Sequence, residues 1–193
     1  MEILITIFSY LLGSIPTGYI VGASAGIDVR KVGSGNVGAT NVARTVGKTK
    51  GLLTLVADIA KGFIPVFIAL RLGLAYTVVA VVGIVAFLGH LYPLFLKFRG
   101  GKGVATAFGV LLALAPAACV ILIVVFGLVV YFSRIASLSS IAAAAAAPIT
   151  LWSLSYPPMF IFVGFVFAVM IILRHRSNIQ RLLAGTEPRF GAH

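Results

Sequence analysis

Between Val104 and Phe132 the chain runs for 29 residues without a charged side chain. A run of about 18 or more apolar residues indicates a membrane-spanning helix. The whole chain has the same character: 61% of its 193 residues are hydrophobic, 10% are charged, and the mean hydropathy is +1.14. Soluble domains are about 45–50% apolar and about 25% charged. The composition therefore excludes a water-soluble globule and a disordered chain, and it predicts a polytopic membrane protein.

The apolar segments are separated by polar residues or turns, and they cover residues 3–23, 51–72, 74–96, 104–132, an alanine-rich stretch to about Trp152, and 159–173. A single helix over 104–132 would reach about 43 Å at 1.5 Å per residue, whereas the hydrocarbon core is about 30 Å thick. Pro116 lies near its middle, where proline breaks or kinks a helix. The alternative is two short helices that meet at Ala115–Pro116.

The distribution of charge favours two helices. Positive residues prefer cytoplasmic loops, and the polar segments hold 13 of the 15 Lys and Arg residues, all except Lys61 and Arg71. If 104–132 forms two helices, all of these segments lie on one face. We therefore predict an all-α integral membrane protein with seven transmembrane helices, its N-terminus outside and its C-terminus cytoplasmic. Residues 1–193 would form one domain with cytoplasmic active-site loops at 24–50, 97–103, 133–140 and 174–187.

The first polar segment is rich in glycine and in hydrogen-bond donors. Gly33, Gly35 and Gly38 allow the backbone to curl so that N–H groups converge on an anion. Arg44 adds a forked cation that suits phosphate. Neutral donors are supplied by Ser34, Asn36, Thr40 and Asn41. The glycine spacing matches GxGxxG, but no strand precedes it, so a dinucleotide site is not predicted. The alternative is a flexible interfacial loop.

The second polar segment places glycines on both sides of Lys102. Gly101, Lys102 and Gly103 stand immediately before an apolar helix, and a helix N-terminus with its unpaired N–H groups is an anion site. We predict that this segment binds a phosphate. The alternative is that Lys102 is flanking charge of the positive-inside kind.

Ionisable residues also occur within the apolar segments. Asp58 and Lys61 are three residues apart, on one helix face, and charges within a span usually face the protein interior in pairs. A structural ion pair and a functional role are both open. His90 is interpreted as a packed, hydrogen-bonded histidine rather than a base.

Two further groups of candidate residues lie in the polar segments of the C-terminal half of the chain. Ser137, Ser139 and Ser140 either donate to a ligand or cap the helix that follows. His175 and Asn178 share one helical face at the membrane edge, and for them the functional interpretation is favoured.

Polar segments gathered at one interface suit an enzyme that handles one polar and one lipid-like substrate. The alternative is a transporter of phosphate or an organophosphate, but transporters usually show internal symmetry and the two halves show none. The His-x-x-x-x-Asp motif of common acyl-CoA-dependent acyltransferases is absent, since Phe95 and Gln180 follow His90 and His175 at that spacing. With four acidic residues and one cysteine, we expect no metal, no disulfide and no nucleic-acid partner.

Five motifs together resemble the bacterial acyl-phosphate:glycerol-3-phosphate acyltransferases (the PlsY-type family), over about residues 10–187. In order they are Gly33-Ser34-Gly35-Asn36-x-Gly38-Ala39-Thr40-Asn41-x-x-Arg44, Asp58-x-x-Lys61-Gly62-x-x-Pro65, Gly89-His90-x-x-Pro93, Phe98-x-Gly100-Gly101-Lys102-Gly103-Val104-Ala105-Thr106 and Arg174-His175-x-x-Asn178-Ile179-x-Arg181-Leu182-x-x-Gly185-x-Glu187.

The resemblance implies a seven-helix enzyme of the bacterial inner membrane. It would move a fatty acyl group from acyl phosphate to the 1-hydroxyl of sn-glycerol 3-phosphate, giving lysophosphatidic acid and phosphate, with membrane lipid around it and without cofactor, metal or acyl-CoA. We expect Ser34, Lys102, His175 and Asn178 to be catalytic. The expected substrate-binding residues are Gly35, Asn36, Gly38, Thr40, Asn41, Arg44, Gly101, Gly103 and Ser140.

Overall fold

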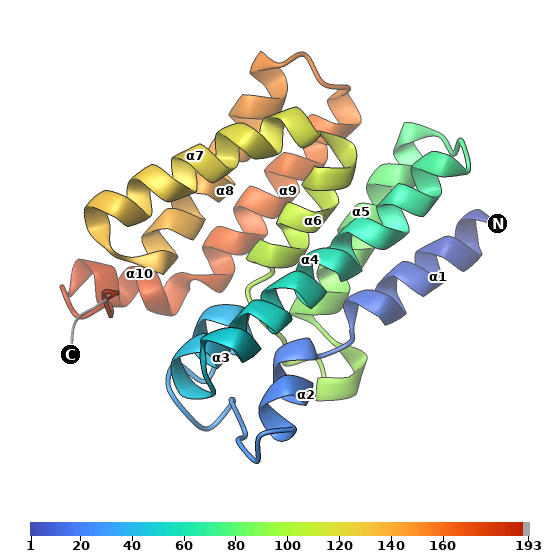
Figure 1. The fold of residues 1–193 in the computed structure, drawn as a ribbon. Coiled ribbons are helices and arrows are strands. Elements are labelled where there is room, and N and C mark those ends of the chain that lie inside the picture. The colour runs from blue at the N-terminus through green and yellow to red at the C-terminus, as the bar shows by residue number, and fades with distance from the viewer. Residues whose placement is uncertain (191–193) are drawn as a thin grey trace. The chain divides into compact units, whose positions relative to one another are not determined.

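The structure, a computed structural model, describes residues 1–190, and over that range it contains helices and no strand (Figure 1). The chain divides into two compact units, residues 1–113 and the residues from Leu114 onward. Each unit is described by itself.

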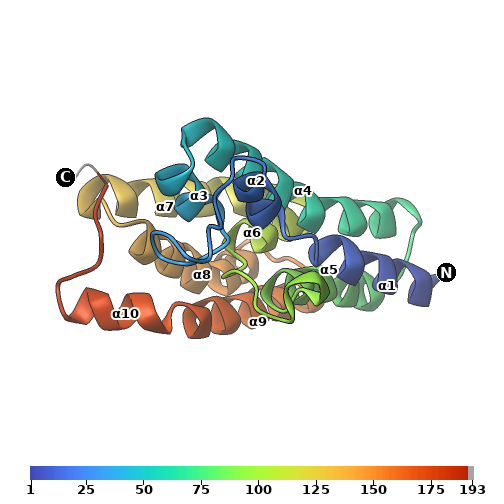
Figure 2. The ribbon, with the colours of Figure 1, turned by 90° about the horizontal axis from the view of Figure 1, so that it is seen from below.

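The first unit contains most of the helices. They are α1 (Glu2–Gly13), α2 (Thr17–Ala23), α3 (Ala39–Thr45), α4 (Lys48–Arg71), α5 (Tyr76–Leu91), the short 3-10 helix η1 (Leu94–Leu96) and α6 (Val104–Leu114), whose last residue crosses the boundary. Helices α1, α4 and α5 pack on one another, and α2 and α3 pack against α4 and each other (Figure 2). Together α1 and α2 form the first apolar segment, which is interrupted at Ile15–Pro16.

Glycine lets the helices of this unit approach closely. A Cβ at Gly62 of α4 would overlap the carbonyl oxygen of Thr106 in α6, and one at Gly109 would overlap the carbonyl oxygen of Ile59. Lipid tails are as apolar as leucine, so helix association in a membrane depends on close van der Waals packing at small residues. Helices α4 and α6 are therefore held together by contact between their backbones.

The second unit consists of α7 (Pro116–Ser133), α8 (Ala136–Ser153), α9 (Pro158–Arg174) and α10 (Arg176–Leu183). Helix α8 packs against α7 and α9. Helix α7 begins at Pro116, where the fixed φ and missing N–H of proline suit the first position of a helix. The two-helix alternative for residues 104–132 is therefore confirmed. A bend of 60° separates α10 from α9.

Among residues 1–190, five helical segments are long and apolar enough to cross a membrane, or six if the bent pair of α9 and α10 is one span. Helix α6 has 11 residues and reaches about 17 Å, less than the core of about 30 Å. The structure supports a multi-pass, all-helical membrane protein. The seven crossings, the orientation of the termini and the single-domain organisation stay predictions.

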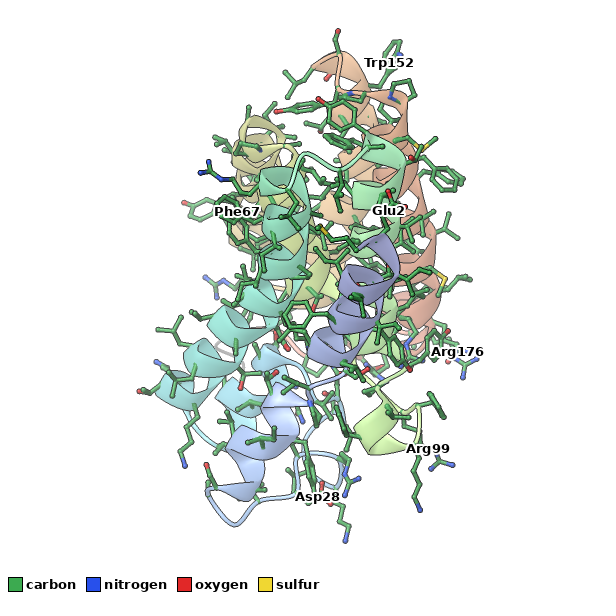
Figure 3. The ribbon with its side chains drawn as sticks, turned by 90° about the vertical axis from the view of Figure 1, so that its right-hand side faces the viewer. Glu2, Asp28, Phe67, Arg99, Trp152 and Arg176 are labelled. Carbon is green, nitrogen blue, oxygen red and sulfur yellow. The ribbon has the colours of Figure 1, made fainter. Side chains whose placement is uncertain are left out.

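Polar segments lie at one end of each unit. In the first unit Glu2 marks one end, and Asp28 and Arg99 lie at the other (Figure 3). In the second unit Trp152 and Arg176 mark opposite ends (Figure 3). Within each unit, the basic segments therefore gather at one end, as the positive-inside rule predicts.

Candidate active site

The first polar segment is folded rather than flexible. Val29, Val37 and Val42 are buried together with Leu96 of η1, and α3 lies within the segment. The flexible-loop alternative is therefore wrong. Sequence reasoning missed α3 because it is only seven residues long and its N-cap, Gly38, forms no side-chain cap. Leu96 is the last residue before the second polar segment, so the first segment packs against the part of the chain that leads into the second.

Asn41 holds the glycine-rich turn in shape. Its side-chain Nδ2 donates to the carbonyl oxygens of Val29 and Asn36, both at 2.9 Å, and of Val32 at 3.2 Å, and its Oδ1 accepts from the Ser34 N–H at 2.9 Å. Only 2% of Asn41 is exposed. The backbone donor at position 34 is thus used within the turn. The side chains of Ser34, Thr40 and Arg44 lie on the exposed side of the segment.

Gly33 is required beside this amide. Its φ is +60°, in the left-handed region that glycine adopts without steric cost. A Cβ there would also overlap Oδ1 of Asn41. The curled backbone expected from the glycines is present, and Asn41 stabilises it.

An ion pair lies at the start of the same segment. The Arg30 guanidinium donates to both carboxylate oxygens of Asp28, at 2.9 and 2.8 Å, and stacks 4.5 Å from the centre of the Tyr19 ring. These hydrogen bonds lower the pKa of Asp28 to about 2. Arg30 is therefore engaged with Asp28, whereas Arg44 extends from the last turn of α3.

The second polar segment is anchored to the end of α5. The N–H of Phe98 donates to Pro93 O at 2.9 Å, that of Gly100 to Leu91 O at 3.1 Å and that of Gly101 to His90 O at 3.2 Å. The last four carbonyls of a helix lack donors within the helix, and the two glycines supply donors for two of them. A Cβ at Gly101 would overlap the His90 ring. This anchoring fixes the turn in which Lys102, half-buried, precedes α6.

A cluster of buried charged side chains, Asp58 and Lys61, lies on α4. Lys61 Nζ lies 2.8 Å from Asp58 Oδ1, and the two side chains are 5% and 2% exposed. The same oxygen accepts from the Thr17 hydroxyl at 2.5 Å, and His90 Nδ1 lies 3.5 Å from it. Lys61 also donates to Ile15 O at 2.9 Å. The predicted interior ion pair is confirmed, and these residues line a cavity of about 10 Å³, room for about one water.

In the second unit, His175 occupies the bend between α9 and α10. The residue is 2% exposed, and its Nδ1 lies 2.8 Å from Ile171 O. A carbonyl oxygen only accepts, so Nδ1 carries the hydrogen. The acceptor nitrogen of the neutral ring is then Nε2.

Glu187 organises the polar end of this unit. Its Oε1 accepts from Asn178 Nδ2 at 2.6 Å and from the Ser137 hydroxyl at 2.7 Å, while Oε2 accepts from Arg181 Nε at 2.7 Å. Burial raises the pKa of this carboxyl, but the three hydrogen bonds outweigh it and the pKa lies below the ordinary value. Glu187 was not among the predicted site residues. Its signal in the sequence is that it is the only acidic residue after Asp58.

The serines at the start of α8 do not cap it. Ile135 is the N-cap and forms no side-chain cap, so the capping alternative is wrong. Ser139 and Ser140 donate to the carbonyl oxygens of Ile135 and Ala136, each at 2.9 Å. Over residues 1–190 no group of three or more His, Cys, Asp or Glu side chains is arranged to hold a metal ion.

The predicted site residues therefore form two sets. In the first unit, the segment that carries Ser34 and Arg44 packs on Leu96, five residues before Gly101. The second unit brings Asn178 and the 133–140 link together through Glu187, next to His175. A family model described as glycerol-3-phosphate acyltransferase matches residues 3–185. The chain belongs to this family.

Similar proteins agree with the family over the whole chain. Glycerol-3-phosphate acyltransferases of Geobacter metallireducens and Geobacter sulfurreducens are 54% and 48% identical to it, over 100% and 99% of this chain and 99% and 98% of theirs. Crystal structures of PlsY, an integral membrane glycerol 3-phosphate acyltransferase, match with TM-scores of 0.96 for the glycerol 3-phosphate form and 0.93 for the lysophosphatidic acid form. The two structures are 44% and 43% identical in sequence to this chain. Each match covers 98% of this chain, and the matches cover 96% and 95% of the two PlsY chains. The family decides against the transporter alternative.

Proposed function

We propose that this membrane acyltransferase takes its acyl group from acyl phosphate and transfers it to the 1-hydroxyl of sn-glycerol 3-phosphate in the bacterial inner membrane. The products are lysophosphatidic acid and inorganic phosphate. The family supplies the acyltransferase class and the acceptor. The donor, the residue roles, and the topology of seven crossings with the N-terminus outside are our proposals.

One observation carries the donor proposal: Leu96 packs with Val29, Val37 and Val42, so the second basic glycine-rich segment begins beside the first. Two substrates that both carry phosphate need two such segments. Acyl phosphate is a mixed anhydride and already activated, so no covalent nucleophile on the protein is required. The protein then contributes positioning and stabilisation of charge.

We assign the roles of the residues as follows. Lys102, with the amides of Gly101 and Gly103, would bind one phosphate. Ser34, Asn36, Gly35, Gly38, Thr40 and Arg44 would hold the other phosphate or the developing oxyanion, in the turn that Asn41 shapes. His175, Asn178 and Ser140 would orient the glycerol hydroxyl.

The reaction is one acyl transfer. The hydroxyl oxygen of glycerol 3-phosphate attacks the acyl carbonyl carbon, and a new ester C–O bond forms. The C–O bond to the phosphate breaks, and its electron pair leaves with the phosphate. The hydroxyl proton passes to a phosphate oxygen. No step needs an oxidant, a metal or a thiol.

The donor is tested with purified protein in nanodiscs, given glycerol 3-phosphate and either palmitoyl phosphate or palmitoyl-CoA. Lysophosphatidic acid is measured by mass spectrometry, and nanodiscs without protein serve as the control for uncatalysed transfer. We expect rapid product formation from palmitoyl phosphate and at least about 100-fold slower formation from palmitoyl-CoA. Comparable rates with the two donors, or activity with palmitoyl-CoA only, would contradict the proposal.

A further inference from the structure

The buried charges on α4 connect the two glycine-rich segments. Asp58 Oδ1 accepts from Thr17, which begins α2, and lies next to Nδ1 of His90, near the end of α5. Asp58 is itself about 1% exposed. One carboxylate oxygen on α4 thus contacts two other helices, and each of these helices adjoins one of the glycine-rich segments.

On the α2 side, the contact reaches the first segment through close packing. A Cβ at Gly18, the residue after Thr17, would overlap the carbonyl oxygen of Val37, and one at Gly22 would overlap the side chain of Val29. Any shift of α2 therefore shifts residues 29–37, the segment that carries Ser34. Lys61 strengthens this link, because it donates to Ile15 O in the interruption between α1 and α2.

On the α5 side, the contact reaches the second segment through His90. The carbonyl of His90 accepts from the Gly101 N–H at 3.2 Å, and the His90 ring lies against the Gly101 Cα. The position of the His90 ring therefore sets where the turn before Lys102 can lie.

We propose that Asp58 is a positioning residue that fixes the two glycine-rich segments relative to each other, through Thr17 on one side and His90 on the other. It contacts neither substrate. The proposal rests on the proposed function for its kinetic test, because it assumes that both segments hold substrate phosphates. A structural ion pair that only stabilises the helices would not set the spacing between two phosphates.

The test uses Thr17→Val, because Asp58 variants leave Lys61 buried without its carboxylate partner and destabilise the fold. Valine keeps the shape of threonine and removes the hydroxyl that donates to Asp58, while Asp58 keeps Lys61 as its partner. Thr17→Ser restores the hydroxyl. The matched control is Thr54→Val, because the Thr54 hydroxyl is buried on α4 and donates only to Lys50 O of its own helix, at 2.9 Å.

We expect Thr17→Val to raise the KM of one of the two substrates about tenfold, since small misplacements of binding groups are costly. The kcat should change little, while the Tm should fall by a few degrees because a hydrogen bond to a buried charged group is lost. Thr17→Ser should restore the KM and the Tm, and Thr54→Val should leave both KM values as in wild type. Unchanged KM values would overturn the proposal. A fall in Tm and kcat with both KM values unchanged, or a KM that Thr17→Ser does not restore, would also overturn it.

A binding measurement separates this proposal from that of the donor. The dissociation constants of glycerol 3-phosphate and of a non-hydrolysable acyl phosphonate are measured calorimetrically for wild type and Thr17→Val. If wild type fails to use acyl phosphate, the donor proposal fails. A tenfold weaker affinity of Thr17→Val for either ligand would still support the positioning role of Asp58. If Thr17→Val binds each ligand with the same affinity as wild type, that role is contradicted.

Discussion

At the scale of single residues, the positions that carry charge at the site differ in how firmly they are held. Arg30 is engaged with Asp28, and Arg181 with Glu187. The turn that carries Lys102 is fixed to the end of α5 by the amides of Gly100 and Gly101. A cation on an anchored backbone needs little reorganisation to stabilise charge that develops on a phosphate. Lys97, five residues earlier in the same segment, is exposed.

Replacing Lys102 by alanine should therefore reduce kcat/KM by about 10²–10³, by analogy with the loss of an oxyanion-hole donor. The matched control is Lys97→Ala, which removes the same charge from the same segment and should change the rate less than about twofold. Both are measured by lysophosphatidic acid formation in nanodiscs. If Lys102→Ala retains more than half of the activity, Lys102 is flanking charge.

His175 raises the question of which group removes the hydroxyl proton. The Nδ1 hydrogen bond to Ile171 O leaves the ring able to accept through Nε2, which suits either an orienting residue or a base. A phosphate monoester has a second pKa of about 6, so the substrate dianion is as good a base as imidazole near neutral pH. It also enters the site together with the hydroxyl. We therefore expect His175 to orient glycerol 3-phosphate while a substrate phosphate takes the proton.

On this mechanism His175→Ala should raise the KM for glycerol 3-phosphate about tenfold and reduce kcat only slightly. A positioned general base contributes typically about 10²–10⁴ in rate. The kinetic constants are measured from pH 5.5 to 8.5 for wild type and variant. A loss of kcat near 10⁴, together with disappearance of a pH limb near 6–7, would identify His175 as the base.

At the scale of elements, one carboxylate joins three parts of the second unit. Glu187 accepts from Ser137 at the start of α8 and from Asn178 and Arg181 of α10. The N–H of Phe190 also donates to Arg134 O at 2.7 Å. The C-terminal segment is thus hydrogen-bonded to the link between α7 and α8. Its Glu187 also orients the Asn178 side chain.

Glu187→Gln should lower the Tm by several degrees. A hydrogen bond to a charged group contributes about 1.5–3 kcal/mol to the free energy of unfolding, and each kcal/mol changes the Tm by about 2–4 °C in a chain of this size. The folded pKa of Glu187 is lowered, so its stabilising effect is complete above the ordinary pKa of about 4.3 and is lost as pH falls through the folded value. The difference in Tm from wild type should therefore shrink below about pH 4.

Differential scanning fluorimetry from pH 7 to pH 3 measures that difference. Glu2→Gln is the control, since Glu2 is an exposed acid in the first unit, at the end away from Asp28 and Arg99. A Tm difference that stays constant down to pH 3, or one of equal size for Glu2→Gln, would contradict the role given to Glu187.

The elements that sequence could predict are those set by local chemistry. Hydropathy is a property of each segment, so the apolar helical segments were predictable, and Pro116 located the break between α6 and α7. Helix α3 and the Glu187 network were missed because they depend on contacts between residues far apart in the chain, such as Val42 with Leu96 and Ser137 with Glu187. The role of Asn41 in shaping the turn likewise depends on where Val29 lies, which no residue pattern reveals.

At the scale of the whole molecule, the number of crossings depends on α6. With 11 residues it reaches about 17 Å, so it crosses the bilayer only if the protein around it replaces lipid. The charge argument requires that crossing, because otherwise the basic segment after Arg174 lies on the opposite side from Arg44 and Arg99. The topology is therefore a test of whether the positive-inside rule outweighs helix length here.

Single cysteines decide this in a background in which Cys119, which is buried, is replaced by alanine. Positions on exposed polar segments are used: Ser34, Arg99, Arg134 and Ser177. Seven crossings with the N-terminus outside place all four on the cytoplasmic side, so each should be protected from a membrane-impermeant maleimide in intact cells and labelled after permeabilisation. The control is Ser155→Cys, in the turn between α8 and α9, which should label without permeabilisation. Labelling of Ser177→Cys and Arg134→Cys in intact cells, with Ser34→Cys and Arg99→Cys protected, would show that residues 104–132 cross once and that the basic C-terminal segment lies outside.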